Sequence, residues 1–350
     1  MKSQSKLYVF INSLLLVVLL AACGNAPTQV TEPTAGPTAK PTEAELPVVK
    51  IQALDGGVTT AVAKIIEEQG FDKVNGFKGE FLLVGGDASI QFMLQRNSDV
   101  SFDCDLITPA LLRSQGHKIS TFYPIATQDA TLVVRGDSPY KTAEDLKGKL
   151  VGHDGLESGT MTAAQILLKA FHNIDIEKDY NLQLTDEAAL MRLLNRGDLE
   201  AIFLGQPEVL ISQAEYGSKS VWGPAGAEWT AQHGGHILNI SMCAYEEWLV
   251  QHPDLARGVM AAWDDALAWI KADPSRLGQS PFPDIFGIED PKIMQGFVDL
   301  VANTEYFTNS WTEDDVNAGN DFLKFAAEIG TIIQEVPENS VVRLDTLLGK

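Results

Sequence analysis

Apolar and polar positions follow two different periods along most of the chain. Short apolar runs of strand length end in glycine or polar turns, and the next segment carries apolar residues every three or four positions, as on one face of a helix. The first repetitions of this pattern predict strands over residues 48–53, 81–84 and 100–107 and helices over residues 59–69 and 89–96. Such alternation of strands and helices is typical of an α/β protein with a mostly parallel sheet.

The same pattern resumes after residue 130. Here it predicts strands over residues 131–135, 148–152, 201–204 and 238–242 and helices over residues 142–146, 157–172 and 188–194. From Glu246 onward the chain is mainly helical, with Trp248, Val259, Trp263 and Ile270 among its apolar positions. We therefore expect two α/β units followed by a helical tail.

The first residues have the pattern of a targeting segment. Lys2 and Lys6 precede an apolar run over residues 7–20, which is shorter than the roughly 20 residues that a spanning helix needs. Leu20-Ala21-Ala22-Cys23 follows the run and resembles the lipobox of bacterial lipoproteins, in which the cysteine is diacylated. The sequence thus predicts a lipoprotein signal peptide over residues 1–23 with Cys23 as the lipidation site. A plain cleaved signal peptide or an uncleaved signal anchor is the alternative, and both also imply export.

Residues 24–47 are rich in Pro, Thr, Ala and Glu and contain almost no large apolar side chain. Such a segment buries too little apolar surface to offset the entropy lost on ordering, and its prolines keep it extended. We interpret it as a stalk between the membrane anchor and the folded body.

Composition narrows the functional classes. The 350 residues include 26 Lys and Arg against 47 Asp and Glu, a formal net charge of −21, and the charges of the predicted leader and stalk cancel, so the body carries the excess. This charge argues against nonspecific binding of nucleic acid or of anionic lipid. With 45% hydrophobic residues the chain can build real cores, whereas three cysteines are too few for a disulfide-stapled scaffold.

Three stretches resemble a known family. The stretches are residues 131–152, which include Thr131-Leu-Val-Val-Arg-Gly-Asp-Ser138 and Asp145-Leu-Lys-Gly-Lys149, residues 196–207, and residues 98–116. They are similar to segments of the solute-binding proteins of the nitrate, sulfonate and taurine class, which serve ABC importers and have thiamine-precursor binders as relatives. The resemblance covers about residues 48–245. The chain departs from the family pattern at Leu54-Asp55-Gly56-Gly57 and at Thr160-Met161.

The resemblance implies a type II periplasmic-binding-protein fold, in which two lobes, each a mostly parallel sheet flanked by helices, are hinged by crossings. Lobe one would contain residues 48–134 and 243–350, and lobe two residues 135–242. The implied function is that of a lipid-anchored, extracytoplasmic, monomeric receptor that captures a small solute between the lobes. It would deliver the solute to ABC permease and ATPase subunits, without a cofactor and without catalysis. The implied solutes are nitrate, sulfonates, taurine or heteroaromatic vitamin precursors.

Candidate ligand-binding residues follow the predicted strands, where helix N-termini present N–H groups and glycines allow close approach of a ligand. They are Asp55, Gly56, Gly57 and Thr59; Gly86, Asp87 and Ser89; Thr108; Ser158, Gly159 and Thr160; and Gln206, Trp222 and Asn239. An anionic solute would be held by these local helix N-termini, because the field of the whole chain is negative.

Several of these residues have a simpler interpretation. Asp87, Ser89 and Ser158 have the residue types that cap helices. Trp222 and Trp229 can pack in a core as well as stack on a flat ligand. His233 and His236 have a metal-ligand spacing, but the glycines between them favour an ordinary loop. Cys104 and Cys243 are either paired or separate buried thiols.

Two other functions remain open at this point. An enzyme on the same fold, related to thiamine-pyrimidine synthases, would need a reactive Lys and His, and neither motif is recognisable. The sequence also lacks GxSxG, HExxH, Walker and GxGxxG patterns. A ligand-sensing accessory protein cannot be distinguished from a transport receptor by sequence.

Overall fold

The computed structural model describes residues 45–330 and 333–350. The predicted signal peptide, Cys23 and all but the last three residues of the predicted stalk lie outside the described residues. Residues 45–350 form one compact unit. Within the described ranges, no helix has the length and apolarity needed to cross a membrane.

The first sheet has five strands in the order β2-β1-β3-β10-β4. Their bounds are β1 Val48–Leu54, β2 Lys78–Val84, β3 Val100–Cys104, β4 Ile119–Thr127 and β10 Leu238–Tyr245. Strand β1 is parallel to β2 and β3, and β10 is antiparallel to β3 and β4. We call it sheet one.

Sheet two has the order β7-β6-β8-β5-β9. Its strands are β5 Thr131–Val134, β6 Leu150–His153, β7 Asn181–Leu184, β8 Ala201–Leu204 and β9 Lys219–Trp222. Strand β6 is parallel to β7 and β8, and β5 is antiparallel to β8 and β9. Both sheets thus place an antiparallel strand in the fourth position, and each such strand directly follows a change of sheet. The expected mixed α/β architecture is confirmed.

The strand pairing corrects the predicted boundaries between the two halves. Strand β5 pairs with β8 and β9 over residues 131–134, so the chain changes sheet between β4 and β5, at residues 128–130, and not after residue 134. The return to sheet one occurs by Leu238 at the start of β10 and not at residue 243. An apolar run shows that a segment is a buried strand but does not show which sheet it joins.

Helices cover both faces of sheet one. One core contains side chains of α1 (Gly57–Gln69), α10 (Glu246–Gln251), α11 (Pro253–Ala272), α12 (Phe282–Ile285) and α13 (Pro291–Asn303) together with β1, β3 and β4. The short helix α2 (Phe71–Val74) packs beside α11, and α15 (Leu344–Leu347) also contributes to this core. Residues of α3 (Gly86–Leu94) and α4 (Ile107–Ser114) pack around the Cys104 and Cys243 side chains.

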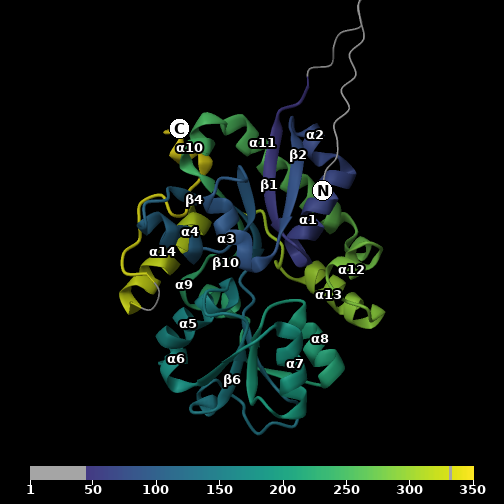
Figure 1. Cartoon of the computed structure of the whole chain (residues 1–350), viewed down its shortest axis with the longest axis vertical. Coiled ribbons are helices and arrows are strands. Elements are labelled where there is room, and N and C mark those ends of the chain that lie inside the picture. The colour runs from purple at the N-terminus through teal and green to yellow at the C-terminus, as the bar shows by residue number, and fades with distance from the viewer. Residues whose placement is uncertain (1–44, 331–332) are drawn as a thin grey trace, which may run out of the picture. The chain divides into compact units, whose positions relative to one another are not determined.

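Sheet two lies between two helical layers, with α5 and α6 on one side and α7 and α8 on the other (Figure 1). The bounds are α5 Gly159–His172, α6 Ile176–Asp179, α7 Glu187–Arg196, α8 Glu208–Tyr216 and α9 Ala225–His233. Helix α14 (Glu313–Ile329), from the C-terminal tail, joins the same core as α5 and α9. Short 3-10 turns occupy Glu144–Leu146 and Pro274–Gly278.

The pattern of apolar residues missed several elements. Strand β4 was not predicted because Pro124 interrupts it, and the structure tolerates this proline because β4 is the edge strand of sheet one. Strand β3 ends at Cys104, so the predicted extension to residue 107 is wrong. Strands β7 and β9 and helices α4, α8 and α9 were also not assigned.

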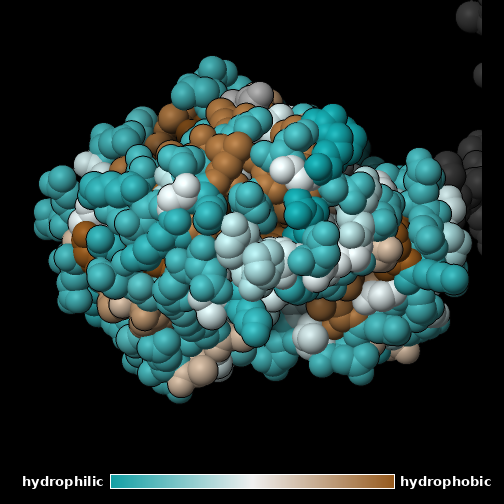
Figure 2. Space-filling model, turned by 90° about the horizontal axis from the view of Figure 1, so that it is seen from below, coloured by the Kyte–Doolittle hydropathy of each residue, from teal (hydrophilic) through white to brown (hydrophobic). Residues whose placement is uncertain are grey.

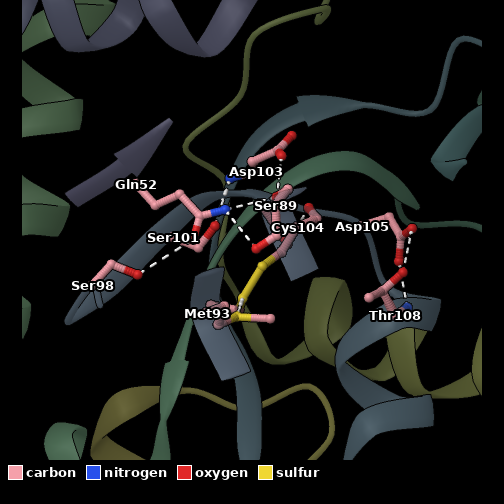
Figure 3. Close-up of a disulfide and its surroundings, with 11 residues drawn as sticks. Gln52, Ser89, Met93, Ser98, Ser101, Asp103, Cys104, Asp105 and Thr108 are labelled. Atoms are coloured by element: carbon pink, nitrogen blue, oxygen red, sulfur yellow. Dashed lines mark hydrogen bonds between the residues drawn. A yellow bond between two sulfur atoms is a disulfide. The ribbon is translucent and has the colours of Figure 1, made fainter. Parts of the chain in front are cut away.

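Cys104 and Cys243 are joined by a disulfide that links β3 to β10 (Figure 3). The Sγ atom of Cys243 lies 3.5 Å from Sδ of Met93 in α3. The question that the sequence left open is thus answered in favour of pairing, between residues separated by 139 positions.

Candidate functional site

The two crossings between the sheets meet at Asp129. This residue lies in the first crossing, between β4 and β5, and its side chain is 5% exposed. Its Oδ1 accepts a hydrogen bond from Nδ2 of Asn239, at the start of β10, at 3.0 Å. Its Oδ2 accepts one from the backbone N–H of Gln206, which follows β8, at 2.8 Å. A single carboxylate thus connects both crossings and a loop of sheet two.

The N-terminus of α5 packs against sheet one at the same place. The carbonyl of Gly159 accepts a hydrogen bond from Nε2 of Gln128 at 3.1 Å. A Cβ added to Gly159 would lie 2.7 Å from Oδ1 of Asn239 and 3.2 Å from Cβ of Asp105. We call the region around Asp129, Gly159, Gln206 and Asn239 the junction. Three of these four residues were predicted as ligand-binding, and the structure brings them together.

A polar network lies at the end of β3 in sheet one (Figure 3). Oγ of Ser89 accepts a hydrogen bond from Nε2 of Gln52 at 2.7 Å and donates one to Oδ2 of Asp103 at 2.6 Å. Burial raises the pKa of Asp103 to about 6, although the bond from Ser89 opposes the shift. The predicted residue Ser89 therefore holds a carboxylate and does not serve as the N-cap of α3, which is Gly85.

Thr108 has a structural role in the first turn of α4. Its backbone N–H donates to Oδ1 of Asp105 at 2.6 Å, and its hydroxyl donates to Oδ2 at 3.0 Å. Burial raises the pKa of Asp105, and the hydrogen bonds from Thr108 partly oppose this shift. Asp105 and Thr108 thus satisfy each other, also visible in Figure 3.

The loop after β1 is held by two threonines. Oγ1 of Thr59 accepts a hydrogen bond from the N–H of Leu54 at 2.9 Å, and Oγ1 of Thr60 accepts one from the N–H of Gly56 at 3.0 Å. Gly56 and Gly57 have φ values of 92° and 72°, which glycine adopts at little cost. Asp55, which lies between the end of β1 and Gly56, is exposed.

Gly86 begins α3 and Asp87 follows in the same helix. Ser158 is the N-cap of α5, where its Oγ accepts from the N–H of Met161 at 3.2 Å and donates to Oδ1 of Asp154 at 3.0 Å. The capping interpretation of Ser158 is thus confirmed, and capping does not exclude a role in binding. Thr160 lies in the first turn of the same helix, half-buried.

Sequence reasoning did not select four acidic residues in this part of the molecule. Each follows a strand or lies in a crossing: Asp129, Asp154, Glu187 and Glu208. Loss of contact with water, as the largest cause, raises the pKa of the buried Asp129 to about 6 and raises the pKa of the half-buried Glu187 and Glu208. Asp154 is an exposed residue. The neighbouring carboxylates add to the shift for Glu187 and Glu208, which begin α7 and α8. A search for acidic residues directly after strands would have found Asp154, but not Glu187, since β7 was not recognised.

Two further polar oxygens at the junction are the hydroxyl of Tyr306 and the side-chain oxygen of Gln206. The Tyr306 side chain is 5% exposed, and its hydroxyl lies 3.5 Å from the carbonyl oxygen of Gln206. Asp129 and Glu208 are close enough to raise the pKa of Tyr306, which burial raises most. Oε1 of Gln206 is buried and has no hydrogen-bond partner among the described residues.

The tryptophans and histidines singled out by sequence lie elsewhere. Trp222 is buried in the core of sheet two, where its Nε1 donates to Glu228 at 2.7 Å, so the packing interpretation is correct and the proposed role in ligand binding is not supported. Trp229 is fully buried and stacks on His233 with ring centroids 4.2 Å apart. Nε2 of His236 lies 2.9 Å from Glu305. In the part of the chain that the structure describes, no group of three or more metal-ligating side chains is found.

The chain matches one family model. The model for NMT1/THI5-like proteins matches residues 100–277, just over half of the chain. No curated protein sequence matches at a significant level.

Solved structures share the fold at low sequence identity. The periplasmic aliphatic sulphonate binding protein SsuA from Escherichia coli superposes with a TM-score of 0.67 and 14% identity, over 87% of this chain and 99% of that chain. The alkanesulfonate-binding protein SsuA from Xanthomonas axonopodis pv. citri, bound to MOPS, gives a TM-score of 0.66 and 13% identity, over 86% and 100%. The desulfurization enzyme DSZB gives 0.61 and 15%, over 87% and 99%. The type II periplasmic-binding-protein fold is confirmed, and this fold hosts both receptors and an enzyme.

Proposed function

The chain belongs to the NMT1/THI5-like family, and from this premise we propose that it is the solute-binding component of an ABC importer. It captures a small solute between the two halves of the body and presents it to a permease that an ATPase subunit drives. The observation that carries the proposal is the meeting of both crossings with loops of sheet two at Asp129. When the two halves move about the crossings, the hydrogen bonds of the buried Asp129 carboxylate change. Closure of the halves is thereby coupled to whether a solute lies at the junction.

The proposal includes an extracytoplasmic location and a lipid anchor. The disulfide between Cys104 and Cys243 supports the location, because such bonds persist in oxidising compartments. The lipobox resemblance at Cys23 supports the anchor. Cys23→Ser is expected to abolish labelling by a radioactive fatty acid and to release the chain from the membrane fraction. Continued labelling of the variant would exclude Cys23 as the lipidation site.

We also propose that the receptor acts as a monomer and has no catalytic activity. The face shown in Figure 2 is mainly hydrophilic, with hydrophobic residues gathered in smaller areas, as is normal for a surface that needs no permanent partner. Exposed apolar residues such as Leu83 and Leu184 lie on different sheets. Sedimentation of the purified chain is expected to give the mass of one copy.

Transport and catalysis are distinguished by the fate of the solute. Deleting the gene is expected to abolish uptake of the solute that the purified chain binds. The same solute, incubated with the purified chain, is expected to be recovered chemically unchanged by mass spectrometry. Recovery of a product formed in proportion to the protein would favour the enzyme alternative and contradict the proposal.

Closure of the two halves is tested at Gly159. A methyl group at this position meets Asn239 and Asp105 across the junction, so Gly159→Ala is expected to hold the halves apart. Overpacking of this kind costs about 1–3 kcal/mol, which corresponds to a roughly 5- to 150-fold loss of solute affinity. The matched control is Gly296→Ala in α13, where an added Cβ meets no atom within 4 Å. Equal affinities of the two variants would show that closure at Gly159 is not needed for binding.

A further inference from the structure

His172, the last residue of α5, lies between two carboxylates from other elements. Its Nδ1 is 2.7 Å from Oε1 of Glu144, in the 3-10 turn Glu144–Leu146. Its Nε2 is 2.8 Å from Oε1 of Glu228, in the first turn of α9. The second oxygen of Glu228 accepts a hydrogen bond from Nε1 of the buried Trp222, in β9, at 2.7 Å. We call the two contacts of His172 with Glu144 and Glu228 the clasp.

The geometry of the clasp requires a proton on both ring nitrogens of His172. An ionised carboxylate only accepts hydrogen bonds, whereas a neutral imidazole has one donor and one acceptor. A neutral ring would therefore turn a lone pair towards one of the two carboxylates, and only the imidazolium can donate to both. Burial acts to lower the pKa of His172, but the hydrogen bonds with Glu144 and Glu228 outweigh burial and raise this pKa.

The elements around His172 carry other charged residues, most of which have partners of their own. The pairs are Lys169 with Asp175, Lys178 with Asp175, Lys147 with Asp179, Lys324 with Asp321, Lys219 with the carbonyl of Ser138, and Asp145 with the N–H of Thr142, while His233 stacks on Trp229, and Glu177 and Glu328 are exposed. Glu144 and Glu228 are the charged groups that raise the pKa of His172, so they are the ones that hold its proton.

The clasp bears on the crossings through α9. The N–H of Ala225, the first residue of α9, donates to the carbonyl oxygen of Ala130 in the first crossing at 2.9 Å. The N–H of Gly226 donates to the carbonyl oxygen of Gln128 at 3.0 Å, and a Cβ on Gly226 would collide with the same oxygen. After its last residue, α9 continues into the second crossing, residues 234–237. A change in the position of α9 is therefore transmitted to both crossings.

We propose that His172 is a positioning residue whose proton keeps α9 clasped to α5, so that protonation of the clasp braces the first crossing. Glu228 lies in the same turn of α9 as the two N–H groups that bind this crossing. At the other end of α5, the carbonyl of Gly159 accepts a hydrogen bond from Gln128, also in this crossing. Loss of the proton removes one donor and opens the clasp. The proposal goes beyond the proposed function, because it adds a control of the crossings in the protein without solute.

The direction of the pH dependence follows from the raised pKa of His172. The clasp is closed below the ordinary histidine value of 6.5 and opens as the pH rises through the raised value. Glu228→Gln changes this dependence, because the amide oxygen can accept from Trp222 while the amide N–H donates to a neutral His172. Closing the clasp then no longer needs the second proton. The exposed His252 lies outside the clasp, so His252→Gln is the matched control for His172→Gln.

The experiment follows the His172 ring and the first amides of α9 in the purified full chain without added solute. At pH 7, where an ordinary histidine is mostly neutral, nitrogen-15 NMR is expected to show both ring nitrogens of His172 protonated. Amide exchange at Ala225 and Gly226 is measured from pH 6 to pH 9 and corrected for the intrinsic rate at each pH. We expect it to become roughly fivefold faster as the clasp opens, as for the loss of a partly exposed ion pair.

The variants separate a proton-dependent clasp from a merely structural contact. His172→Gln and Glu228→Gln are expected to lose the pH-dependent step in exchange, and His252→Gln is expected to keep it. A structural contact would make exchange faster at every pH and leave the step in place, which would overturn the proposal, as would a His172 ring that is neutral at pH 7. No solute takes part, so this result and the fate of the receptor function, tested by uptake and mass spectrometry, are independent.

Discussion

The carboxylates at the end of sheet one and those at the end of sheet two are all half-buried, but they differ in their hydrogen bonds. Asp103 and Asp105 each accept hydrogen bonds from a neighbouring hydroxyl, of Ser89 and Thr108. Glu187 and Glu208 receive none from any side chain in the described part of the chain. The first pair is satisfied internally and stabilises the loops after β3. The second pair has no such donor among the described residues, so no side-chain hydrogen bond offsets the cost of its partial burial.

The disulfide crosslinks two strands of sheet one, and its removal has the largest expected effect on stability. Replacing both Cys104 and Cys243 by Ser is expected to lower the free energy of unfolding by about 3 kcal/mol, because a crosslink over a long loop restricts the unfolded chain. Urea unfolding measures the change. A reducing agent should destabilise the parent to the same extent and leave the double variant unaffected; equal stability of parent and variant would contradict the prediction.

The pH dependence of the free energy of unfolding tests whether the carboxyl groups with raised pKa are shielded from water. A carboxyl whose pKa is raised in the folded state stabilises the fold below its unfolded pKa and loses this contribution as the pH rises through the folded value. For Asp129, raised from 3.8 to about 6, the loss between pH 5 and pH 7 is about 1–2 kcal/mol. Asp103, Glu187 and Glu208 act in the same direction.

The protein without solute is therefore expected to be more stable at pH 5 than at pH 7. His172 adds to this trend, because Glu144 and Glu228 raise its pKa although burial opposes the shift. Carboxyl groups with a lowered pKa, such as Asp315, stay ionised throughout this pH range. Calorimetric melting from pH 5 to pH 8 measures the slope, and Asp129→Asn should reduce it. A melting temperature that rises steadily with pH would show that these carboxylates are not buried as the structure has them.

Loss of a satisfied carboxylate should destabilise the protein. Asp105→Ala leaves the N–H and hydroxyl of Thr108 without their acceptor and is expected to cost about 1 kcal/mol, the usual net value of a hydrogen bond. Asp55→Ala, at an exposed position, is the control and should change stability by less than about 0.5 kcal/mol. Urea midpoints compare the two. If both variants unfold alike, the bonds to Thr108 contribute nothing.

Removing a carboxylate that has no side-chain hydrogen bond should instead raise the free energy of unfolding, by the smallest amount of the changes predicted here. Glu187→Gln removes a buried charge but also a favourable interaction with the N-terminus of α7, so at pH 8 we expect a gain of about 0.5 kcal/mol. Glu289→Gln is the matched exposed change. A clear loss of stability in Glu187→Gln would mean that the two groups of carboxylates do not differ as described.

The sequence predicted the helices with capping residues better than the strands and the site. Ser158 was recognised as a capping residue because its contact, with Met161, lies three residues away. Strand β4 was missed because a proline inside a strand is acceptable only at a sheet edge, and the edge position depends on strands far along the chain. Gly159, Gln206 and Asn239 were selected one by one, but nothing in the sequence shows that Asp129 and its contacts join them.

By itself the sequence determined the alternation of strands and helices, the acidic balance of the body and the family resemblance, because these depend on neighbouring residues and on composition. Only the tertiary structure decided that β5 belongs to sheet two, that Cys104 pairs with Cys243, and that Asp129 joins Gln206 to Asn239. The physical reason is that pairing and desolvation depend on segments far apart in the chain.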